Sequence, residues 1–133
     1  MSAQLVAEQT ITVGTPTTIE GLSPSALYGV VFEDDGATAY LYALDFSREG
    51  QPIVDSLHVY NVEQVADREK PSLVQLVWSL DGLKAAVLIN KHAHAVFDFE
   101  ARRGYCRTNL PPPDRRWTEH DHAWDDEALD LFE

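Results

Sequence analysis

The sequence has only one cysteine, Cys106, so no disulfide can form within the chain. This excludes the disulfide-rich scaffolds that many small secreted domains use. No apolar run approaches the ~18 residues that a membrane-spanning helix needs. The first residues, MSAQLVAEQT, also lack the basic and apolar regions of a secretory signal. We therefore expect a cytoplasmic protein that does not associate with a membrane.

Positive charge is scarce as well. The 133 residues include 10 Lys and Arg against 22 Asp and Glu, which gives a formal net charge of −12. Phosphate backbones repel a protein this acidic, so we expect no binding to nucleic acid. The length fits one domain, and a hydrophobic content of 44% is sufficient for an ordinary core.

The common motifs of catalytic sites are missing. The chain has no glycine-rich phosphate loop, no serine nucleophile elbow, and no His-Glu-x-x-His or Cys-x-x-Cys metal motif. Cys106 lies beside Arg107, and a nearby cation activates a thiol. A nucleophilic cysteine also needs a positioned histidine, so we interpret Cys106 as a buried strand residue. We identify no catalytic residue and no cofactor, which favours a protein that is not an enzyme.

Stretches rich in β-branched and aromatic residues predict strands along most of the chain. They lie at 27–33, 39–46, 53–60, 73–80, 83–90 and 93–100, with shorter candidates at 10–13 and 104–108. Asp35-Gly36 and Asp81-Gly82 separate neighbouring strands and are typical of hairpin turns. Residues 27–32 and 39–44 are apolar on both faces, so both faces must be covered. We predict a mainly β fold: an antiparallel sandwich or barrel-like sheet of about 6–8 strands built from hairpins.

The C-terminal end differs from the rest. Three consecutive prolines at 111–113 end the sheet, and residues 117–133 contain seven acids and no Lys or Arg. Within them, Trp124, Ala128 and Phe132 recur at helical spacing. We predict a β-rich domain over 1–116 and an acidic amphipathic α-helix at about 122–132. A helix this short is stable only when it is docked on the domain.

This acidic, aromatic segment is suited to docking on a basic protein. The predicted partner-binding residues are Trp117, Trp124, Asp125, Asp126, Glu127 and Asp130. The alternative is that the segment only packs its apolar side on its own domain. Both can hold, with the apolar side facing inward and the acids facing outward. The preceding basic cluster supplies a predicted anion site at Arg102, Arg103 and Arg107, unless these residues neutralise the acidic segment.

Histidines and carboxylates offer weaker candidates. His92 and His94 share one face of a predicted strand, and His120 and His122 form a similar pair in the C-terminal segment. Two ligands are fewer than a metal site needs, so we expect solvent-facing histidines and no bound metal. Asp55 lies in a predicted strand and becomes interesting if it is buried, because a desolvated carboxylate needs a reason.

Five motifs together resemble a small family of bacterial proteins that has no assigned activity. They are VFEDDG at 31–36, YALD at 42–45, LHVYNV at 57–62, VWSLDG at 77–82 and FDFEARRGYC at 97–106. The resemblance covers roughly 27–117 and implies a bacterial cytoplasmic protein. It provides no catalytic or binding residues.

Three functions remain open. The first is a non-catalytic interaction protein that binds a basic partner, for example an immunity- or antitoxin-like inhibitor, because complementary charge speeds association. The second is a β-barrel that binds or converts a small molecule in its interior. The third is an assembly component that forms homo-oligomers through an aromatic sheet face. A filled core with a contiguous acidic surface favours the first, and a polar-lined cavity favours the second.

Overall fold

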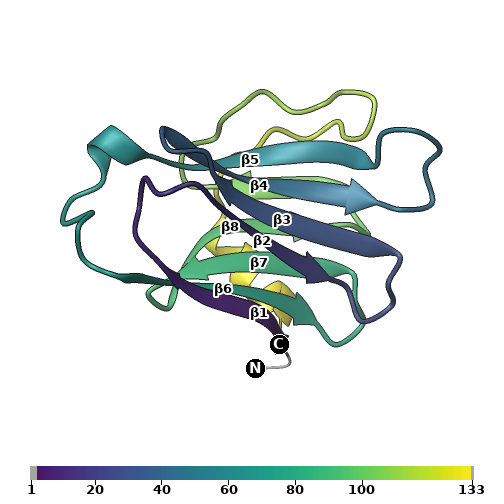
Figure 1. The fold of residues 1–133 in the computed structure, drawn as a ribbon. Coiled ribbons are helices and arrows are strands. Elements are labelled where there is room, and N and C mark those ends of the chain that lie inside the picture. The colour runs from purple at the N-terminus through teal and green to yellow at the C-terminus, as the bar shows by residue number, and fades with distance from the viewer. Residues whose placement is uncertain (1–2, 133) are drawn as a thin grey trace.

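The computed structural model describes residues 3–132 and consists of two antiparallel sheets that pack face to face (Figure 1). One sheet has five strands in the order β1-β6-β7-β8-β9, and the other has four in the order β2-β3-β4-β5. The strands are β1 (Ala3–Ile11), β2 (Thr17–Leu22), β3 (Tyr28–Asp34), β4 (Thr38–Asp45), β5 (Ile53–Asn61), β6 (Ser72–Ser79), β7 (Lys84–Ile89), β8 (His92–Asp98) and β9 (Arg103–Cys106). The predicted antiparallel sandwich is confirmed, and the described residues do not close into a barrel.

Two strand predictions need correction. β1 is a full strand that pairs with β6 from Ala3 to Ile11, whereas the sequence pattern predicted only its end. β2 has no counterpart in the prediction, because only Ile19 of its inward side chains is large and apolar; Gly21 faces the core without a side chain. A short 3₁₀ helix, η1 (Val62–Gln64), lies between β5 and β6.

Both predicted hairpin turns are present. Gly36 joins β3 to β4 with φ +99°, and Gly82 joins β6 to β7 with φ +74°, a conformation that favours glycine. The carboxylate of Asp34 accepts hydrogen bonds from the Gly36 backbone N–H at 2.8 Å and from the Gly14 N–H at 2.7 Å. It also accepts one from the Tyr60 hydroxyl at 2.6 Å, so one buried carboxylate fixes two turns and β5.

The interior between the sheets is filled by apolar side chains. The largest that are fully buried come from both sheets: Phe32, Leu41, Leu57, Leu76, Trp78 and Phe97. The indole N–H of Trp78 donates to the carbonyl of Gly21 at 3.3 Å, which satisfies its one polar atom across the interface.

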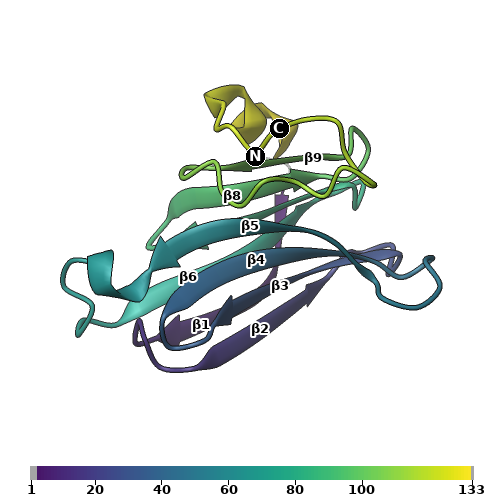
Figure 2. The same cartoon turned by 90° about the horizontal axis from the view of Figure 1, so that it is seen from above.

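The C-terminal helical segment lies on the outer face of the five-stranded sheet (Figure 2). It is a 3₁₀ helix, η2 (Asp126–Phe132), so the α-helix predicted at 122–132 is wrong in both type and start. The start is later because His122 pairs with the end of β9, where its carbonyl accepts from the Cys106 N–H at 3.0 Å. Ala128 and Phe132 pack on a second apolar cluster, formed on this face by Ala86, Val96 and Tyr105.

No helix in the part of the chain that the structure describes is long and apolar enough to cross a membrane.

Candidate functional site

The chain after β9 crosses from one sheet to the other and back. The Leu110 carbonyl accepts a hydrogen bond from the His58 N–H of β5 at 2.8 Å, and the His122 carbonyl accepts from the Cys106 N–H of β9 at 3.0 Å. Residues 110–122 therefore lie along the side of the sandwich where β5 and β9 are neighbours. We call this stretch the closing segment.

A buried pair anchors the closing segment. The Nε2 atom of His122 lies 2.7 Å from Oδ2 of Asp55, and the two side chains are 0% and 3% exposed. Asp55 also accepts a long hydrogen bond of 3.4 Å from the Asp114 N–H. His122 was expected to face solvent, so that expectation is wrong. Within residues 3–132 its Nδ1 atom has no hydrogen-bond partner, so the ring is held by one hydrogen bond, through Nε2.

The acids of η2 and the residue before it form an outward strip. Asp125, Asp126, Glu127 and Asp130 are all exposed, while Phe132 on the opposite side is buried. We call these four residues the acidic strip. The segment that carries them packs against the sheet through Ala128 and Phe132.

Trp124 connects the acidic strip to β9. Its ring is half-buried under the guanidinium of Arg107, whose central carbon lies 3.8 Å from the ring centroid. The indole N–H donates to the carboxylate of Asp126 at 2.7 Å. Arg107 itself donates two hydrogen bonds to the Ala93 carbonyl, at 3.1 and 3.2 Å. A cation on an aromatic face contributes about 0.5–1 kcal/mol at an exposed site.

Trp117 lies apart from the acidic strip. Its ring meets Phe97 and Phe99 edge-on, with centroid distances of 6.3 and 6.1 Å. It is half-buried against the core, so its main role is packing, although the sequence placed it among the partner-binding residues.

The three arginines of the predicted anion site point to three different places. Arg107 covers Trp124, and Arg103 lies over the Tyr105 ring at 4.7 Å. Arg102 lines a surface pocket of about 350 Å³ together with Arg115, Arg116 and His120. Arg116 is held by the Asp114 carboxylate through two bonds of 3.0 and 3.1 Å. Anion binding stays a prediction. Because Arg102 is the one of the three that lines this pocket, we place the predicted anion site there.

The other histidines lie in different environments. His92 and His94 line a surface cavity of about 530 Å³ beside Tyr60 and Lys70. Burial lowers the pKa of His94, and the positive charges of Arg107 and His92 lower it further. Among residues 3–132, no three His, Cys, Asp or Glu side chains converge as a metal site requires. Cys106 is a buried strand residue, as interpreted from the sequence.

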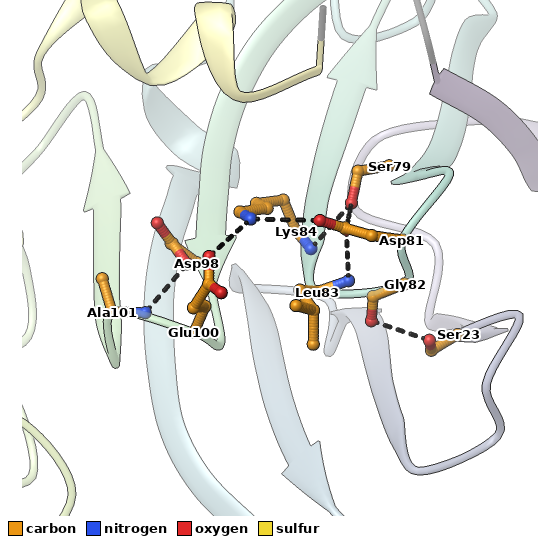
Figure 3. A network of polar contacts seen from close by, with 9 residues as sticks. All are labelled: Ser23, Ser79, Asp81, Gly82, Leu83, Lys84, Asp98, Glu100 and Ala101. Atoms are coloured by element: carbon orange, nitrogen blue, oxygen red, sulfur yellow. Dashed lines mark hydrogen bonds and ion pairs between the residues drawn. The ribbon is translucent and has the colours of Figure 1, made fainter.

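A charged network surrounds the β6–β7 hairpin on the outer face of the five-stranded sheet, the face on which η2 lies (Figure 3). The Lys84 ammonium lies 3.0 Å from Glu100 and 3.3 Å from Asp81. Burial acts to lower the pKa of Lys84, but its hydrogen bonds to Glu100 and Asp81 outweigh burial and raise that pKa. Ser23 reaches from the other sheet to donate to the Gly82 carbonyl at 2.8 Å. Each group has a structural partner, so the network stabilises the turn.

Comparison with known proteins places the chain in a family. Residues 11–133 match the family described as uncharacterized proteins conserved in bacteria (DUF2251). The chain belongs to this family. It is also 40% identical over 121 residues to an uncharacterized protein of Haemophilus influenzae, covering 88% of this chain and 74% of that relative. The resemblance to an uncharacterised bacterial family is thereby confirmed. No solved structure matches the chain.

Proposed function

We propose that this DUF2251 protein acts without catalysis, by binding a basic partner protein through its acidic strip. The observation that carries the proposal is the arrangement of η2, in which Phe132 and Ala128 fix the segment while four carboxylates face outward. Because the segment is already ordered, a partner does not have to supply the free energy of ordering it. An inhibitor that masks a cationic toxin is one form of this function.

Charge supports the same function. The net charge of −12 attracts a basic protein over a distance of about one Debye length, ~8–10 Å at physiological salt. Such attraction raises the association rate more than it raises the affinity. The guanidinium of Arg107 lies 4.0 Å from the Asp126 carboxylate of the strip, and the Asp126 side chain is still 85% exposed.

The filled interior argues against the alternative of a small-molecule barrel. Phe32, Trp78 and Phe97 are fully buried between the sheets, in the space where a barrel would hold its ligand. The cavities around the described residues, such as those beside Arg102 and beside His94, are open at the surface. A binding surface therefore accounts for the architecture better than an enclosed site.

The test compares two variants with equal charge change. One replaces the strip (Asp125→Asn, Asp126→Asn, Glu127→Gln, Asp130→Asn), and the control replaces four exposed acids elsewhere (Glu8, Glu49, Glu63 and Glu69, each →Gln). Each tagged protein is used to capture partners from a bacterial lysate, with elution in about 0.5 M salt. We expect wild type and control to retain the same basic protein and the strip variant to lose it. Equal retention by the strip variant would rule out this surface.

A further inference from the structure

The two outer faces of the sandwich are covered differently. The C-terminal segment lies over β7, β8 and β9, whereas no described segment lies over the outer face of β2, β3 and β4 (Figures 1 and 2). Sheet register places two rows of side chains on this open face. They are Glu20, Val31, Tyr42 and Ser56 in one row, and Leu22, Gly29, Leu44 and Ile53 in the next.

The open face is apolar at one end. Leu22 is 55% exposed and Phe46, just after β4, is 46% exposed. Single exposed apolar side chains are ordinary, but a contiguous group of them marks a contact surface.

A pocket lies within this apolar group. It has a volume of about 150 Å³ and is lined by Glu20, Gly21, Leu22, Gly29, Val30, Val31, Leu44 and Phe46. The Phe46 ring packs over Gly29, since a Cβ atom there would lie 3.1 Å from that ring, so Phe46 forms one wall of the pocket. An apolar cavity of about this size holds a ring the size of benzene, so the pocket fits one apolar side chain.

The strands that carry the pocket bear charge of one sign. Strands β2 to β5 contain no Lys or Arg. Glu20 is exposed and lines the pocket, and Glu33 is its diagonal neighbour on the same face. The Tyr42 hydroxyl donates a long hydrogen bond of 3.5 Å to the Glu33 carboxylate.

We propose that this pocket binds an apolar side chain of a basic protein, whose neighbouring Lys or Arg residues contact Glu20 and Glu33. The choice of a basic partner rests on the proposed function, and the charge of this face supports it independently. A second copy of the chain is a poorer occupant, because a symmetric contact would bring the same carboxylates together. The pocket would thus be an anchor on the face opposite to the acidic strip.

Two small probes with the same ring and opposite charge test the pocket without any partner. Phenethylammonium carries an ammonium group and 3-phenylpropionate carries a carboxylate. We expect phenethylammonium to give saturable NMR shifts at the amides of Gly21 and Gly29, with an affinity about three- to fivefold above that of 3-phenylpropionate. Equal binding of the two probes, shifts confined to other residues, or no shift at about 20 mM would overturn the proposal.

Single-residue variants test which side chains bind the ring and which give the preference for the cationic probe. Glu20→Gln should remove the preference for the cation while leaving ring binding, and Glu8→Gln, an exposed acid on β1, should change neither. Phe46→Ala removes a wall of the pocket and should weaken both probes equally. If Glu20→Gln preserves the preference, the carboxylate is not the recognition group and the proposal fails.

The same variants separate this inference from the proposed function. If the strip variant loses a captured basic protein while Glu20→Gln and Phe46→Ala keep it, the proposed function holds and the pocket is not its anchor. If the pocket variants lose that protein and the strip variant keeps it, the partner binds here and the strip is not the contact surface.

Discussion

His122 and Asp55 meet at 2.7 Å although they lie 67 positions apart. Their contact joins the closing segment to β5. A Cβ atom at Gly104 would lie 2.9 Å from Leu57, 3.1 Å from Phe97 and 3.3 Å from the His122 ring, so glycine leaves room for all three side chains. A carboxylate buried this deeply has to be matched by a partner. His122 therefore accounts for the burial of the Asp55 carboxylate.

We predict that His122→Ala lowers the free energy of unfolding by about 3 kcal/mol, because it leaves the Asp55 carboxylate buried without its main partner. Adding Asp55→Ala should recover part of this loss, since the charge is then gone as well. Urea denaturation of wild type, both single variants and the double variant gives the interaction free energy between the two side chains. Strictly additive losses would show that the two residues do not act as a pair.

Local sequence patterns were sufficient to predict the hairpin turns but not the contact between His122 and Asp55. Asp81-Gly82 needs only its own backbone conformation to form a turn, so the turn can be recognised from two residues. The burial of His122 depends on a partner in a distant strand, and nothing in HDHAW around it indicates that strand. The helix prediction failed for the same reason, because His122 is held in extended chain by β9.

Predictions for the candidate sites agree with the structure where they depend on local spacing and differ from it where they depend on contacts between distant residues. Acids at helical spacing were predicted to face outward, and Asp125, Asp126, Glu127 and Asp130 are exposed. The arginines were grouped because they are close in sequence. Arg102 lies in the turn before β9 with φ +52°, whereas Arg103 is the first residue of β9 and lies over Tyr105, so the two side chains go to different places. Arg115 lines the same pocket as Arg102 from a separate loop. No sequence pattern indicated the pocket at Gly29, because its lining comes from three strands, β2, β3 and β4, and from Phe46 after β4.

A second prediction concerns Gly82. An alanine there would adopt φ +74° and place its Cβ 2.6 Å from the Ser23 hydroxyl, which donates to the Gly82 carbonyl (Figure 3). Gly50 is a matched control, since it has φ +79° but no atom within 4 Å of the added Cβ. We expect Gly50→Ala to cost about 1 kcal/mol of backbone strain and Gly82→Ala about 1 kcal/mol more, from the displaced hydrogen bond. Thermal or urea unfolding that ranks the two variants equally would contradict this.

A third prediction concerns pH. The pKa of His94 is lowered in the folded protein by burial, and the positive charges of Arg107 and His92 add to this effect. The unfolded chain therefore binds the proton more readily, so the contribution of His94 to stability is complete above its ordinary pKa of about 6.5 and decreases as the pH falls below it. The free energy of unfolding, measured from pH 7.5 to 5, should fall less steeply in His94→Gln than in wild type. Parallel profiles would exclude this residue as a source of the pH dependence.

A fourth prediction concerns the pocket at Arg102. Arg115 is fixed by a 2.7 Å hydrogen bond to the Glu119 carbonyl, which holds its guanidinium beside that of Arg102. We expect inorganic phosphate to bind here with millimolar affinity and to shift the amides of Thr118 and His120. Arg102→Gln should weaken binding several-fold, while Arg68→Gln, distant from this pocket, should not. Identical titrations of the two variants would show only a general response to ionic strength.

The last prediction tests whether docking of η2 depends on its inward side. Phe132 is 3% exposed in the second apolar cluster, whereas Leu129, in the same helix, is 38% exposed. Removing a buried large side chain costs about 2 kcal/mol, so Phe132→Ala should lower the free energy of unfolding or detach η2, and Leu129→Ala should change it by less than about 0.5 kcal/mol. Faster amide exchange at Ala128 in Phe132→Ala alone would identify local detachment. Equal effects of the two variants would mean that η2 is not held by this face, and the acidic strip would then lose its fixed presentation.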